Sequence, residues 1–147
     1  MDHRVASLRT PAECEIFARN ATAKKRPDLA IEARRKAVDM LAATHETESP
    51  VEAEAFAAVY AYEALLTRKN GKKTRATKTW QAVKRYGIIE AIQKAVNRAP
   101  QTADYETLRE MGLEDLTFEA LVLRHEAAFS DEAVQASKAR LTESSAG

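Results

Sequence analysis

The chemistry most evident in this sequence is cationic: ten lysine and arginine side chains fall within the 31 residues from Arg68 to Arg98, against one acid, Glu90. These cations are Arg68, Lys69, Lys72, Lys73, Arg75, Lys78, Lys84, Arg85, Lys94 and Arg98. The segment carries a charge of about +9, and because the whole chain carries only +1, the other 116 residues carry about −8. Charge separated in this way is typical of a protein that meets an anionic partner, most often nucleic acid, on one face.

Hydroxyl groups are interleaved with these cations, at Thr74, Thr77 and Thr79. Lysine, arginine and short hydroxyl side chains are the usual contacts of phosphate oxygens. A helix is also expected to begin near Thr77, and a helix start offers free N–H groups to an anion. We therefore expect nucleic acid, DNA in preference to RNA, to be bound through its phosphates. The expected contacts are Lys72, Lys73, Thr74, Arg75, Thr77, Lys78, Thr79, Lys84, Arg85, Lys94 and Arg98.

An extended patch of this kind predicts a steep dependence of binding on salt. If eight of the ten cations met phosphates of duplex DNA, the log–log slope would be roughly −7, at about −0.9 per neutralised phosphate. A slope shallower than about −2 would contradict the extended patch.

Two helices separated by Gly87 make the segment Thr77–Asn97 resemble a DNA-binding helix-turn-helix. The resemblance is partial, because Gln93 falls where the second helix should present a buried aliphatic residue. The aliphatic residues Ile88 and Ile89 indicate that this helix contributes to the core. The sequence therefore favours backbone binding by the preceding loop and helix start. Trp80, the only tryptophan, is expected to fill core rather than to stack on a base.

The residue types and spacings in this sequence give little support for a catalytic or metal-binding site. His3, His45 and His125 lie far apart, and none has a second ligand at the spacing of a zinc motif. Cys14 is expected to be a buried structural thiol. The sequence thus predicts a non-catalytic protein without a metal or cofactor. An enzyme remains an alternative that a polar cleft gathering His45 or His125 with carboxylates would favour.

The elements that must position the basic segment are predicted to be helices. The chain has 147 residues, of which 45% are hydrophobic and 31% charged, with only four glycines and four prolines. This balance favours helix over a β-sandwich or barrel. One cysteine excludes an intramolecular disulfide and is consistent with a cytoplasmic setting. We expect no signal peptide, no transmembrane helix and no membrane partner.

Helix boundaries are marked by local signals. Capping boxes at Thr10–Glu13 and Ser49–Glu52 predict helix starts, and Asn70–Gly71 predicts a helix end, although Asn-Gly also fits a hairpin turn. Thr77 or Thr79 is expected to cap a fourth helix and Thr102 a sixth. A wide apolar stripe predicts that the helix after Ser49 is the most buried.

These signals predict an all-α fold, a single-domain helical bundle or orthogonal array of six to eight short helices. The expected division is a flexible N-terminus (1–9), one domain (10–141) containing the basic segment 68–98, and a flexible C-terminus (142–147). The expected role is a regulatory or targeting domain that binds nucleic acid. The alternative is a protein–protein adaptor whose basic face docks an acidic partner. Alanine-rich faces on the first two helices also suit a protein partner or a homodimer.

Overall fold

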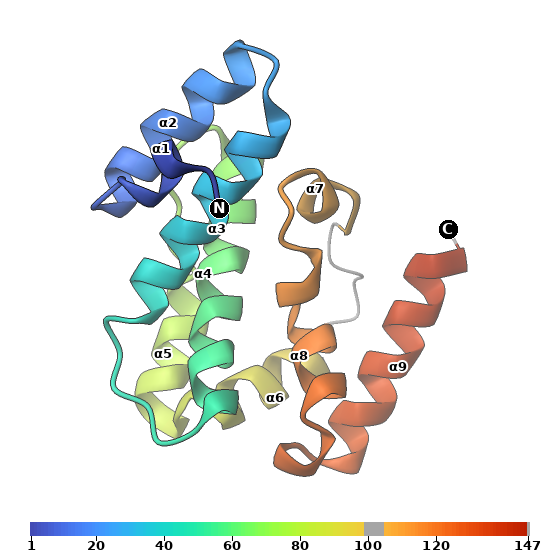
Figure 1. Cartoon of the computed structure of the whole chain (residues 1–147). Helices are drawn as coiled ribbons and strands as arrows, with labels where there is room; N and C mark the ends of the chain where they lie inside the picture. Colours follow the sequence, from blue (N-terminus) through green and yellow to red (C-terminus); the bar gives the residue numbers. More distant parts are fainter. Residues whose placement is uncertain (99–104, 147) are drawn as a thin grey trace.

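A computed structural model describes residues 1–98 and 105–146 of the chain, with side chains described as far as Thr142. Within these residues there are nine α-helices and no strand, which confirms the all-α single domain (Figure 1). The helices are α1 (His3–Ala6), α2 (Pro11–Ala23), α3 (Pro27–Ala42), α4 (Pro50–Asn70), α5 (Thr77–Tyr86), α6 (Ile88–Arg98), α7 (Tyr105–Glu110), α8 (Phe118–Arg124) and α9 (Asp131–Ala146). Two short 3₁₀ turns, η1 (Glu114–Leu116) and η2 (Glu126–Ala128), flank α8.

The helix count exceeds the six to eight expected, because short helices lack the long apolar stripe that makes a helix visible in sequence. Seven helices have seven residues or more. Helix α1, the shortest, falls inside the segment 1–9, where Asp2 caps it and Val5 is fully buried. Helix α9 continues past Leu141 to Ala146.

Both predicted capping boxes are present. The Thr10 hydroxyl accepts from the Glu13 N–H at 3.1 Å, and the Ser49 hydroxyl accepts from the Glu52 N–H at 3.4 Å. Each glutamate reaches back to the N–H of the residue before its cap, at 2.9 Å in both cases. These bonds satisfy N–H groups that a helix start would otherwise leave without partners.

Two other predicted caps have different outcomes. The expected cap at Thr77 or Thr79 is wrong: Ala76 occupies the N-cap position of α5 and makes no side-chain capping bond. The physical reason is that the Ala76 N–H is held by Glu63, which fixes the backbone so that Thr77 becomes the first helical residue. The expected cap Thr102 lies outside the described residues.

Gly71 ends α4 in the left-handed conformation, with φ of 72°, as the Asn70–Gly71 pair predicts. Residues 71–76 run on to α5 as a loop, and no described residue of this segment is in a strand. The hairpin alternative for Asn-Gly is therefore wrong.

Helix α4 is the central element, which confirms the prediction from its wide stripe. In Figure 1 it stands between the α2–α3 hairpin and the C-terminal helices. Its small residues Ala55, Ala58 and Ala61 are buried, as close helix packing requires. Because both of its sides are covered, α4 can present side chains to several neighbours at once.

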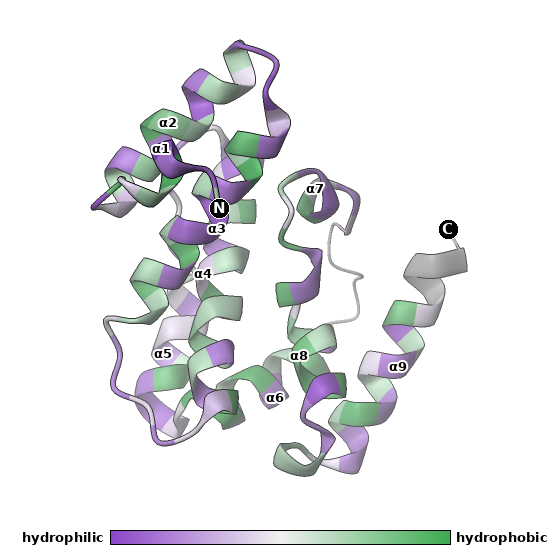
Figure 2. Cartoon of the chain, in the orientation of Figure 1, coloured by the Kyte–Doolittle hydropathy of each residue, from purple (hydrophilic) through white to green (hydrophobic). Residues whose placement is uncertain are grey.

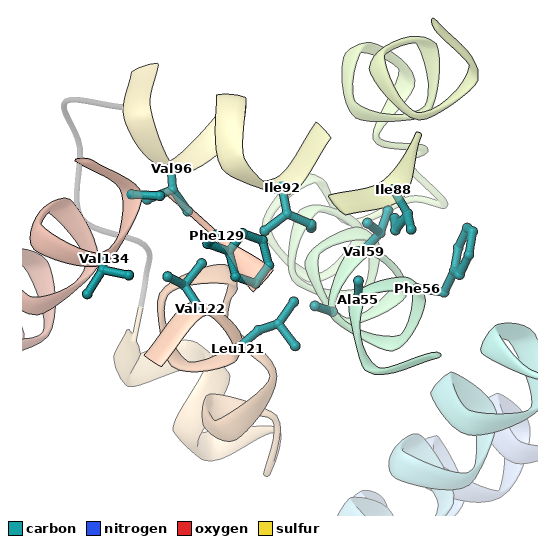
Figure 3. Close-up of a cluster of buried hydrophobic side chains, with 12 residues drawn as sticks. Ala55, Phe56, Val59, Ile88, Ile92, Val96, Leu121, Val122, Phe129 and Val134 are labelled. Atoms are coloured by element: carbon teal, nitrogen blue, oxygen red, sulfur yellow. The ribbon is translucent and has the colours of Figure 1, made fainter. Parts of the chain in front are cut away.

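The largest hydrophobic cluster joins α4 to α6, α8 and α9 (Figure 3). Ile92, Val96 and Leu121 have essentially no exposure and lie among its labelled side chains. A second cluster joins α3 and α4 to α7 and η1, and a third fills the α2–α3 hairpin. In Figure 2 the hydrophobic colour is prominent on α6 and α8, the helices that face α4 in the first cluster. No helix in the described part of the chain combines the length and the apolarity needed to cross a membrane.

Candidate nucleic-acid interface

A buried carboxylate fixes the basic loop to the core. Glu63 lies on α4 and is only 8% exposed. Its Oε2 atom accepts from Arg75 Nε at 2.9 Å, from the Ala76 N–H at 2.8 Å and from Trp80 Nε1 at 2.6 Å. A buried carboxylate is costly to desolvate unless it is hydrogen-bonded, and these three donors supply that need. Glu63 therefore sets where residues 71–76 leave α4 and where α5 begins.

Two threonines hold the loop in shape. The Thr74 N–H donates to Thr67 Oγ1 at 3.0 Å, and Thr74 Oγ1 donates to the Lys72 carbonyl at 2.9 Å while accepting from Asn70 Nδ2 at 3.1 Å. Thr74, one of the expected phosphate contacts, is therefore occupied within the loop. A loop bonded in this way presents Lys72 and Lys73 from a defined backbone.

Helix α5 is the second part of the basic surface. The exposed positions of α5 before Tyr86 share one side of the helix, because they follow Thr77 at spacings of one, four, seven and eight residues. They are Thr77, Lys78, Gln81, Lys84 and Arg85. Thr79 is half-buried on the packing side. We define the basic face as Lys72, Lys73, Lys78, Lys84 and Arg85. No acid occurs between Glu63 and Glu90 in the chain, so nothing on α5 or its loop offsets these charges.

The cations differ in their partners. Lys72, Lys73, Lys78 and Lys84 form no ion pair with any carboxylate of the described chain. Arg75, although its side chain is 58% exposed, is paired with Glu63. Lys94 lies 3.9 Å from Glu90 on the same helix. The expected contacts thus divide into a basic face of uncompensated lysines with Arg85 and a smaller set that has internal partners.

Helix α6 is a core helix rather than an exposed reading element. Ile88, Ile92 and Val96 are buried against α4, α8 and α9. The side chain of Gln93 accepts from the Ser130 N–H at 2.7 Å and so joins α6 to the start of α9. Arg98, the last expected contact, is exposed at the end of α6.

Trp80 is partly buried and packs against the edge of the core, so the expectation that it fills core is met in part. The His45 ring stacks on Phe56, with ring centroids 4.0 Å apart, and lies 5.6 Å from the Trp80 ring, which is itself 6.3 Å from Phe56. Tyr60 lies 5.1 Å from Trp80 and its hydroxyl is 2.8 Å from His45 Nε2. Burial lowers the pKa of His45. This aromatic stack ties the loop before α4 to α5.

A hollow of about 640 Å³, lined by both charged and apolar residues, lies between α3, α4 and the η1–α8 region. Its lining brings His45 together with the carboxylates Asp39, Glu54 and Asp115, the type of arrangement that the enzyme alternative calls for. Two arginines of the lining are already paired. Arg35 holds Asp115 through two bonds of 2.9 and 2.8 Å, and Arg124 holds Glu54 at 3.2 Å.

His125 also contributes to this network. It bonds to Glu54, 71 residues earlier in the chain, and so joins the end of α8 to α4. Asp39 has a raised pKa, caused mainly by burial. The network joins three parts of the fold, and its ion pairs account for most of the charged groups in the hollow.

Cys14 is fully buried in the α2–α3 hairpin, and burial raises the pKa of its thiol, which confirms the predicted structural thiol. Among the described residues, no three His, Cys, Asp or Glu side chains are placed to hold a metal ion. Comparisons with protein-family models, with curated proteins and with solved structures find no match for this chain. The candidate interface is therefore defined by its own geometry: the basic face, held in place by Glu63.

Proposed function

We propose that this protein binds nucleic acid, with DNA as the favoured form, by holding phosphates along the basic face. The observation that carries the proposal is the group of four exposed lysines, Lys72, Lys73, Lys78 and Lys84, that have no carboxylate partner in the described chain. Like charges gathered on one surface repel one another, so such a face is best stabilised by an anion. A polyanion neutralises several of these lysines at once, and the release of its counterions favours binding.

The loop and helices that carry the basic face favour binding to the phosphate backbone over reading of bases. Residues 71–76 are fixed by Glu63 and Thr67, and α5 has ten residues, a length of about 15 Å. The helix after Gly87 uses its apolar side for the core. A regulatory or targeting role, with no chemistry performed on the nucleic acid, fits a surface of this kind.

The test is charge reversal on the basic face with a matched control. The variant Lys72→Glu/Lys73→Glu/Lys78→Glu should lose its gel shift with duplex DNA at low salt and its retention on heparin. The control Arg9→Glu/Arg19→Glu/Lys24→Glu changes the net charge equally but lies on and around α2. It should lose far less affinity, because only the removal of cations at the interface removes phosphate contacts.

Equal losses in both variants would show that net charge, not the basic face, governs binding. If the wild-type protein shifts no duplex or single strand at low salt, the proposal is wrong. The adaptor alternative, in which the basic face docks an acidic protein, then takes its place. Circular dichroism of each variant establishes that the fold is intact.

A further inference from the structure

Tyr86 is the one large aromatic side chain that the described basic segment exposes. It is 43% exposed at the last position of α5, whereas Trp80 is partly buried and contacts His45 and Tyr60. Burying a ring of this size is favourable, so an exposed tyrosine next to the basic face is a candidate for contact with a ligand. The position is at the end of the basic face, next to Lys84 and Arg85.

Cations surround this ring. The Arg85 guanidinium lies 5.4 Å and the Lys94 ammonium 4.5 Å from the ring centroid. Lys94 is 43% exposed, so it can move from the ring to a phosphate without leaving water. Both cations lie over the ring, so a base that stacks on it displaces at least one of them, which can then meet the backbone phosphates as in other sites for unpaired bases.

A hollow of about 470 Å³ opens beside the ring, at the turn between α5 and α6. Tyr86 and Gly87 are among its lining residues, and Glu52, Glu90 and Gln93 contribute polar groups, with Glu52 accepting from the Glu48 N–H and Glu90 facing Lys94. Carboxylates accept hydrogen bonds from the amino and imino groups of bases. The Gln93 carbonyl is occupied by Ser130, which leaves its NH₂ group as a donor to a base carbonyl. The volume lies within the range of small-ligand sites.

We infer that this hollow receives an unpaired nucleobase of a single-stranded nucleic acid, with Tyr86 as the stacking residue. The inference rests on the proposed function and sharpens it, because it makes a single strand, not a duplex, the preferred partner at this end of the basic face. The stacking and edge contacts are shared by DNA and RNA, so both are tested. Arg85 and Lys94 hold the phosphates on either side of the base.

The experiment measures fluorescence anisotropy with labelled single-stranded DNA, single-stranded RNA and the blunt DNA duplex of the same mixed sequence. Tyr86→Leu should weaken binding to at least one single strand about tenfold, the loss expected for one stacked base, and duplex binding by less than about twofold. Tyr86→Phe keeps the ring and should bind like the wild type. Tyr62→Leu, a second exposed tyrosine that lies on α4 against Phe118, should also bind like the wild type.

The single strand that loses more affinity in Tyr86→Leu identifies the sugar of the natural partner. If wild type binds the duplex with strong salt dependence but Tyr86→Leu changes nothing, or weakens strand and duplex equally, this inference is overturned while the proposed function stands. If wild type binds none of the three probes, both this inference and the proposed function are wrong. Trp80 fluorescence, which reports the junction of α4 and α5, checks that each variant is folded.

Discussion

Glu63 on α4 accepts a hydrogen bond of 2.6 Å from the indole Nε1 of Trp80 on α5. The same carboxylate oxygen accepts from Arg75 and from the Ala76 N–H. One buried atom therefore joins the central helix, the loop that carries Lys72 and Lys73, and the helix that carries Lys78 and Lys84. The stability of the fold and the placement of the basic face depend on the same contact.

Replacing Glu63 should be costly. Glu63→Ala leaves a backbone N–H and an indole N–H without partners inside the protein and should lower the free energy of unfolding by about 3 kcal/mol. Glu63→Gln keeps an acceptor and should cost about half as much, since only the charge is lost. Urea unfolding followed by Trp80 fluorescence measures both.

The matched control is Glu110→Ala. Glu110 also faces an arginine, Arg68, but at 4.0 Å and with 64% of its side chain exposed. A pair of this kind contributes less than about 1 kcal/mol. Equal losses of stability in Glu63→Ala and Glu110→Ala would contradict the anchoring role of Glu63.

Two glycines with the same backbone angle should respond differently to alanine. Gly71 and Gly112 both have φ of 72°, but a methyl group at Gly71 meets nothing, whereas at Gly112 it meets the side chain of Ile31 on α3. Gly71→Ala should cost about 1 kcal/mol from the left-handed backbone alone. Gly112→Ala adds overpacking and should cost about 3 kcal/mol. Thermal or urea unfolding compares the two, and equal losses would show that α3 does not press on the loop after α7.

The aromatic stack predicts a pH dependence of stability. Burial lowers the pKa of His45 from its ordinary value of 6.5, so the unfolded chain takes up this proton before the folded protein does. The stabilisation from the neutral ring is therefore present above pH 6.5 and lost as the pH falls from 6.5 toward the lower folded pKa.

His45→Phe keeps a ring on Phe56 but cannot be protonated. Its free energy of unfolding should fall less than that of the wild type between about pH 7.5 and about pH 5.5. His3→Gln changes an exposed histidine, and its free energy of unfolding should depend on pH as that of the wild type does. Parallel pH profiles for wild type and His45→Phe would contradict a lowered pKa of His45 in the folded protein.

The features predictable from sequence are those with local causes. The capping boxes at Thr10 and Ser49 and the stop at Gly71 depend on residues within a few positions, and the alanine-rich stripe of α4 follows from helical periodicity. Cys14 was predicted to be a structural thiol from its neighbours too, because Glu15 follows it and no histidine is near it in the sequence. Such signals fix the helices but not their partners.

Contacts between distant residues could not be predicted in this way. Glu63 lies in a helix where a charged residue ordinarily faces water, and its burial depends on Trp80, 17 residues later. The cap predicted at Thr77 is wrong for the same reason, since the bond from the Ala76 N–H to Glu63 decides where α5 begins. The division of the expected phosphate contacts also depends on folding, because Arg75 and Lys94 meet carboxylates only in the folded chain or helix.

The salt dependence of binding to duplex DNA tests the central claim most directly. The basic face has five cations, fewer than the eight expected contacts that are lysines or arginines, because Arg75 and Lys94 have carboxylate partners and Arg98 lies apart at the end of α6. The logarithm of the binding constant plotted against the logarithm of the salt concentration should therefore have a slope of about −4 to −5, at about −0.9 per phosphate. A slope shallower than about −2, or the absence of binding at low salt, would contradict a phosphate-binding face.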